Sequence, residues 1–168
     1  MRQIRKKATL IKVVIFSLAF AYLEAAVVIY LRQLISASHP EIDRSAILLL
    51  LPGIAFLQPK SVLDIINNSQ LLQIELMRES ATLIMLAMIA SIAGKKIGRK
   101  IAFFFFSFAI WDLFYYVFLK LVINWPTSWT DIDIFFLLPV PWLGPVFVPV
   151  IISTLLIIGT SWYLVKSE

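Results

Sequence analysis

The chain has 168 residues, 61% of them hydrophobic, with a formal net charge of +5, one histidine and no cysteine. Soluble domains contain roughly 45–50% apolar residues, so this composition excludes a soluble globular domain and indicates a polytopic membrane protein surrounded largely by lipid. The lack of cysteine and the single His39 exclude disulfides, a multi-histidine zinc site and a bis-histidine haem built by this chain alone.

The first predicted membrane helix covers residues 8–31. Ala19-Phe20-Ala21 matches the small-residue pattern of a signal-peptide cleavage site. The apolar run nevertheless continues to Leu31, which makes the segment long enough to cross a hydrocarbon core of about 30 Å. We therefore interpret residues 8–31 as a membrane helix that is retained and not cleaved.

A short apolar segment, residues 47–57, lies in the long loop 32–70 that follows. Pro52 and Gly53 interrupt it, and it is shorter than a spanning helix needs to be. We expect a re-entrant or interfacial element there. His39 lies in the same loop, where an isolated histidine is expected to be solvated.

Three further segments are long and apolar enough to span a membrane: residues 71–94, 101–123 and 145–165. Between the last two, residues 134–145 form a second short apolar piece that carries three prolines. We expect this piece also to be re-entrant or interfacial. The predicted fold is therefore all-α, a polytopic transmembrane bundle of about four spanning helices in a single domain, residues 1–168.

Basic residues gather at two places that flank the predicted helices. They are Arg2, Arg5, Lys6, Lys7, Lys95, Lys96, Arg99 and Lys100. Four crossings bring both groups, with Lys166, to the same side, which the positive-inside rule predicts to be cytoplasmic. We thus expect an inner-membrane protein with both termini in the cytoplasm and the loops 32–70 and 124–144 outside. The basic charge is assigned to topology, and no nucleic-acid binding is expected.

Ionisable and phenolic side chains occur in the outer halves of the first three predicted spans or at their rim. They are Glu24, Arg32, Glu75, Arg78, Glu79, Asp112, Tyr115, Tyr116 and Lys120. On each helix they follow a spacing of three, four or eight residues and so share one face. A charge at the centre of a helix in lipid costs about 2.5–3.5 kcal/mol. We therefore expect the three faces to meet in one polar intramembrane cluster.

This cluster has two interpretations, a structural network of ion pairs or a polar pocket that opens to the outer face. The carboxylates and bases nearly balance, as a structural network requires, whereas intramembrane ionisable residues are by default candidates for function. In the second case a divalent cation is one candidate ligand, because hard cations prefer oxygen donors. Its ligands would be Glu24, Glu75, Glu79 and Asp112.

Two other chemistries fit the same residues. Arg32, Arg78 and Lys120 would suit an anionic headgroup or a phosphate, and Asp112 with Glu24 would suit a proton or ion relay. No pair of nucleophile and base is recognisable in the sequence, and no cofactor is expected.

Four stretches of the chain together resemble a family of small prokaryotic membrane proteins to which no function is assigned. They are YLEAAVVIYLR, RESATLIML, FAIWDLFYYVFLK and NWPTSWTDIDIFFLLPVPWLGPV. The resemblance extends over most of the chain beyond the N-terminus. It implies a standalone multi-helix domain of prokaryotic origin, without catalytic residues to carry over.

The function predicted from the sequence is a non-enzymatic integral membrane component: a subunit, an accessory protein or a binder of lipid or ions. Its expected partners are membrane lipids and other membrane-protein subunits or a second copy of the chain. The alternative is a membrane enzyme or small transporter that acts on a lipid headgroup, a cation or a proton through the polar cluster.

Overall fold

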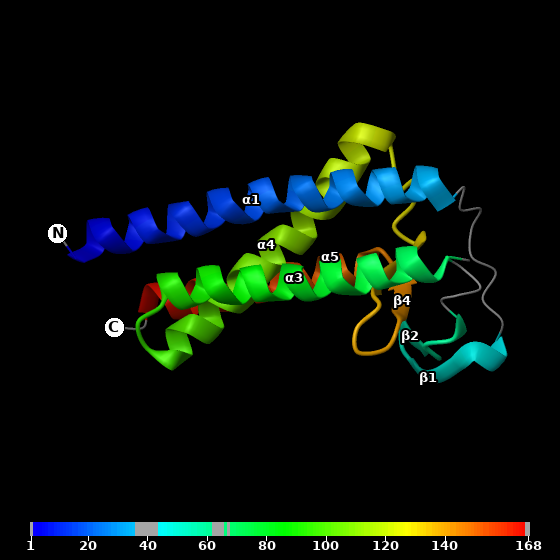
Figure 1. Cartoon of the computed structure of the whole chain (residues 1–168). Coiled ribbons are helices and arrows are strands. Elements are labelled where there is room, and N and C mark those ends of the chain that lie inside the picture. The colour runs from blue at the N-terminus through cyan, green and yellow to red at the C-terminus, as the bar shows by residue number, and fades with distance from the viewer. Residues whose placement is uncertain (1, 36–43, 62–65, 67, 167–168) are drawn as a thin grey trace.

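Four long helices dominate the structure, a computed structural model (Figure 1). It describes residues 2–35, 44–61, 66 and 68–166. The helices are α1 (Arg2–Ile35), α3 (Ser69–Ala93), α4 (Ile97–Ile123) and α5 (Phe147–Lys166). Each is long and apolar enough to cross a membrane, in agreement with the four helices predicted from the sequence.

Helix α4 is the centre of the bundle and packs against α1, α3 and α5. Its buried face combines small residues such as Ala102 and Ala109 with the rings of Phe103 and Phe106. Small residues allow neighbouring helix backbones to approach closely, and the rings fill the remaining space. Large apolar side chains on the outer faces of the helices remain exposed, for example Ile92, as expected where lipid is the solvent.

Both termini and the turn between α3 and α4 lie at one end of the bundle, at the left of Figure 1. We call this the basic end, because the turn carries the exposed Lys95 and Lys96. The opposite end, at the right of Figure 1, carries a small β-sheet and is called the sheet end. The predicted gathering of basic loops on one side thus agrees with the helix arrangement.

The sheet at the sheet end corrects the prediction of an all-α fold. Its strands are β1 (Ile47–Leu51), β2 (Ile54–Leu57), β3 (Ile132–Phe136) and β4 (Trp142–Pro145). They pair antiparallel in the order β1-β2-β4-β3. The two short segments predicted to be re-entrant or interfacial, residues 47–57 and 134–145, therefore supply β-strands.

The breakers in these two segments act as turn residues. Pro52 and Gly53 connect β1 to β2, and Gly53 has φ +81°, a conformation that glycine adopts without steric cost. Gly144 of β4 lies so close to this turn that a Cβ atom on it would be 2.2 Å from the Gly53 carbonyl oxygen. Two sequence-distant glycines thus allow the two hairpins to meet in one sheet.

The sheet packs onto the helices through aromatic side chains. Phe136 of β3 belongs to a buried cluster with Phe20 of α1 and Trp111 of α4. The ring of Trp142 stacks on Phe56 with 5.9 Å between ring centroids, and on Phe136 with 6.0 Å. The sheet end is therefore joined to the bundle by a continuous apolar core, and the polar contacts described next lie beside it.

Candidate functional site

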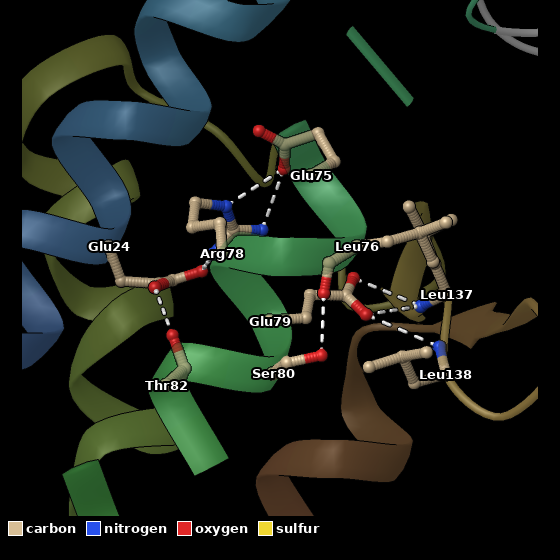
Figure 2. A network of polar contacts seen from close by, with 9 residues as sticks. All are labelled: Glu24, Glu75, Leu76, Arg78, Glu79, Ser80, Thr82, Leu137 and Leu138. Carbon is tan, nitrogen blue, oxygen red and sulfur yellow. Dashed lines mark hydrogen bonds and ion pairs between the residues drawn. The ribbon is translucent and has the colours of Figure 1, made fainter. Parts of the chain in front are cut away.

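Arg78 of α3 joins two helices through carboxylates (Figure 2). Its Nε donates to Glu75 Oε2 at 2.8 Å, its Nη2 forms an ion pair with the same oxygen at 2.8 Å, and its Nη1 donates to Glu24 Oε1 of α1. The hydroxyl of Thr82 donates to the other oxygen of Glu24 at 3.4 Å. Glu24 and Glu75 are buried. We call these four residues the Arg78 cluster.

Glu79 follows Arg78 in sequence but contacts the β-segments instead of α1. Its carboxylate accepts the backbone N–H of Leu137 at 2.9 and 3.0 Å and that of Leu138 at 3.2 Å (Figure 2). These two residues directly follow β3. Hydrogen bonds to a charged acceptor are about twice as strong as neutral ones. Glu79 therefore fastens the connection between β3 and β4 to α3.

Asp133 of β3 is held by two helices. Arg32 Nη2 of α1 donates to Asp133 Oδ1 at 3.1 Å, and the Tyr116 hydroxyl of α4 donates to Oδ2 at 3.1 Å. The Arg32 guanidinium also covers the ring of Trp125, with Cζ 3.8 Å from the ring centroid. Burial raises the pKa of Asp133 to about 6, partly offset by Arg32 and Tyr116, which favour the charged form. We call Arg32, Tyr116 and Asp133 the Asp133 cluster.

Tyr115 interacts with residues of both clusters. It is within electrostatic range of Arg78 in one cluster and of Arg32 and Asp133 in the other. Its ring meets that of Tyr116 edge to face, with 4.9 Å between centroids. The structure thus joins residues of the three predicted helix faces in two places: Glu24 of α1 pairs with Arg78 of α3, and Arg32 of α1 and Tyr116 of α4 both bind Asp133.

Asp112, near the middle of α4, makes a separate contact with α5. The hydroxyl of Ser153 donates to Asp112 Oδ2 at 2.7 Å, and Ser153 itself is buried. This hydrogen bond joins the central helix to the last one. The partner of Asp112 is therefore a hydroxyl of α5 and not a member of the predicted cluster.

Lys120 does not belong to the polar cluster, contrary to the prediction. Its side chain is exposed, and its Nζ donates to the carbonyl oxygen of Pro126 at 2.8 Å. Eight residues of an α-helix complete two turns and a further rotation of about 80°, so Lys120 has turned away from the stripe that starts at Asp112. The end of α4 at Ile123 then brings the following chain to Lys120.

The structure does not form the predicted cation site. Its four carboxylates are divided among three partners: Glu24 and Glu75 bind Arg78, Glu79 binds backbone amides, and Asp112 binds Ser153. Within residues 2–35, 44–61, 66 and 68–166, no group of three or more histidine, cysteine, aspartate or glutamate side chains could hold a metal ion.

The predicted anion site is also divided. Arg32 and Arg78 both bind carboxylates, which leaves Lys120 as the member of the predicted trio that faces outward.

His39, expected to be a solvated loop residue, lies outside the residues that the structure describes.

Several groups that contact the charged side chains were not predicted from the sequence. Asp133 was assigned to an outer loop, although Asp131-Ile132-Asp133-Ile134 has the alternation of a strand with one buried face. That alternation could have indicated the strand, but it would have placed the aspartate face in solvent, whereas Asp133 is buried and Ile132 is exposed. Thr82, Ser153 and the amides that bind Glu79 carry no comparable signal, because only the packing of helices and sheet brings them to the carboxylates.

Comparison with models of protein families, with curated proteins and with solved structures finds no match for the chain. The resemblance to a family of small prokaryotic membrane proteins therefore gains no support. The functional argument rests on the geometry of the clusters.

Proposed function

We propose that the protein is a non-enzymatic integral membrane component, a subunit or accessory protein, that presents its sheet in a fixed orientation at one end of the bundle. One observation carries this proposal: two of the charged side chains of the helices contact β3 or the residues that directly follow it. Arg32 binds Asp133 of β3, and Glu79 binds the amides of Leu137 and Leu138. These charged side chains thus hold β3 and the residues after it against the helices.

The energetics of buried ion pairs support a structural task. Removing two charges from water costs several kcal/mol per ion, roughly what their attraction returns, so a pair such as Arg78 with Glu24 adds little net stability. Leaving one partner alone is unfavourable, however, which penalises alternative arrangements of the helices. A network of this kind specifies one geometry, and a fixed geometry is what a platform for a partner requires.

The sheet offers a surface for such a partner. In the described part of the chain β1 is an edge strand, and Leu48, Leu49, Leu50 and Leu51 are all exposed. Leu50 has 69% of its surface accessible. Apolar edge strands readily pair with other chains. A second membrane subunit or a second copy of this chain is the partner that we propose for this edge.

We further propose that the basic end faces the cytoplasm of a prokaryotic cell, across its inner membrane. The exposed Lys95 and Lys96, at the same end as both termini, support this orientation. The sheet would then lie on the outer side.

A second candidate function, a proton-coupled transporter or enzyme, is favoured by Asp112. Among the contacts of the described residues, the partner of its carboxylate is the Ser153 hydroxyl, and no cation pairs with it. A membrane carboxylate without a cationic partner is a default candidate for ion or proton transfer.

Affinity purification from the native membrane, followed by native mass spectrometry, separates the two candidates. We expect a stoichiometric protein partner or a second copy, lost when Leu49 and Leu50 are replaced by serine. A lone chain that carries proton flux in liposomes would favour the second candidate instead. That result requires the flux to disappear in Asp112→Asn while the variant remains folded.

A further inference from the structure

A mostly apolar groove of about 360 Å³ lies at the sheet end, between α4, the start of α5 and the turn that follows α4. Its lining includes Leu113, Val117, Lys120, Trp129, Val146 and Val150. Binding sites for small molecules typically have volumes of roughly 300–1,000 Å³ and a largely apolar lining with a few polar groups. The groove is separate from both polar clusters apart from Tyr116, which borders it.

The groove runs along the direction in which a lipid chain would lie. Leu113 and Lys120 are seven residues apart on α4, which corresponds to about 10 Å along the helix axis. Lys120 is near the end of the spanning helix, and Trp129 beside it is 66% exposed. Tryptophan and lysine both favour the level of the lipid headgroups. The groove therefore extends from headgroup level towards the middle of the bilayer.

The mouth of the groove carries one positive charge. Lys120 Nζ donates one hydrogen bond, to the Pro126 carbonyl at 2.8 Å, so two of its three N–H groups can serve a ligand. Thr127 and Ser128 stand beside it. The nearby Asp131 carboxylate is turned into its own loop, where its Oδ2 accepts from the Thr127 amide and hydroxyl at 2.7 and 2.8 Å and from the Ser128 amide at 3.2 Å.

We propose that this groove binds one acyl chain of an anionic glycerophospholipid from the leaflet on the sheet side, with the lipid phosphate on Lys120 Nζ. The match of charge and shape carries the proposal: an apolar channel runs into the hydrocarbon region and ends at an exposed ammonium group at headgroup level. Lysine binds phosphate as a point charge and does not require a second fixed donor.

Lys120→Gln tests the headgroup contact, and Lys60→Gln is the matched control, because Lys60 is an exposed lysine on the sheet side away from the groove. Each protein is incubated with phosphatidylglycerol or phosphatidylcholine of identical chains, and native mass spectrometry measures the retained lipid. We expect wild type and Lys60→Gln to prefer phosphatidylglycerol and Lys120→Gln to retain about fivefold less of it. Equal retention in the two lysine variants would overturn the proposal.

Val117→Trp tests the chain-binding part, because Val117 lines the groove and is already 39% exposed, so a larger ring fills the groove without entering the core. Retention of both lipids should fall while the helix content, measured by circular dichroism, stays the same. Unchanged lipid retention would overturn the proposal. Loss of a bound protein instead of lipid would identify a protein as the occupant, with the same consequence.

Discussion

At the scale of single residues, Arg78 is the residue whose loss should destabilise the fold most. Its positive charge neutralises two buried carboxylates on two helices. Arg78→Met leaves Glu24 and Glu75 buried without a cation. Breaking a buried pair in this way costs about 3–5 kcal/mol. We expect a large drop in midpoint temperature when unfolding is followed by circular dichroism in detergent.

The triple variant Glu24→Gln, Glu75→Gln, Arg78→Met is the control for this prediction. It removes the charges together with their partner, so most of the lost stability should return. A triple variant as unstable as the single one would show that packing, and not charge, is what Arg78 contributes.

Glu79→Gln should weaken the attachment of the sheet to α3. The amide oxygen still accepts from Leu137 and Leu138, but without the negative charge that strengthens these bonds. We expect a loss of roughly 1–3 kcal/mol, together with faster amide hydrogen exchange at the two leucines. Gln73→Ala, at an exposed position of the same helix, should leave both measurements unchanged.

Asp133 predicts how stability depends on pH. Burial raises its pKa from 3.8 to about 6 in the folded protein. Between these two values the folded state binds more protons than the unfolded chain, so the free energy of unfolding falls as pH rises from about 4 to 6 and then levels off. Asp133→Asn should remove this part of the slope, which thermal unfolding of both proteins at several pH values measures. Identical slopes would contradict the prediction.

At the scale of secondary-structure elements, helices were readable from the sequence and strands were not. Long apolar runs predict spanning helices directly, and the observed bounds agree. The strands are four or five residues long and mostly apolar, as are short re-entrant segments, and the hairpins were missed for that reason. Pairing of β2 with β4 joins Ala55 to Leu143, a contact that no local pattern contains.

Gly144 tests how closely the two hairpins must approach. A Cβ atom at this position would be 2.2 Å from the Gly53 carbonyl oxygen and 3.1 Å from the Phe135 ring, so Gly144→Ala must displace the sheet. We expect a clear drop in midpoint temperature. Gly159→Ala is the matched control: a Cβ there meets no atom within 4 Å, and alanine in a helix stabilises by roughly 0.5–1 kcal/mol over glycine. Equal effects would contradict the close approach.

At the scale of the whole molecule, the two ends of the helix bundle differ: one carries the basic turn between α3 and α4, and the other carries the sheet. The lack of native cysteine makes this polarity measurable by labelling. In intact cells a membrane-impermeant maleimide should label Lys60→Cys at the sheet end, and Lys95→Cys only after permeabilisation. The reverse pattern would place the sheet in the cytoplasm and contradict the proposed orientation.

The sequence by itself determined the class of protein, the four helices and the residues that must avoid lipid, because helix length, hydropathy and the penalty for an intramembrane charge are local properties. Only the tertiary structure decided which charges pair. The pairing depends on how each helix is rotated about its axis. This rotation places Arg78 against Glu24 and turns Lys120 towards the surface. The pairing also depends on a sheet built from distant segments, which brought Asp133 to Arg32 and backbone amides to Glu79.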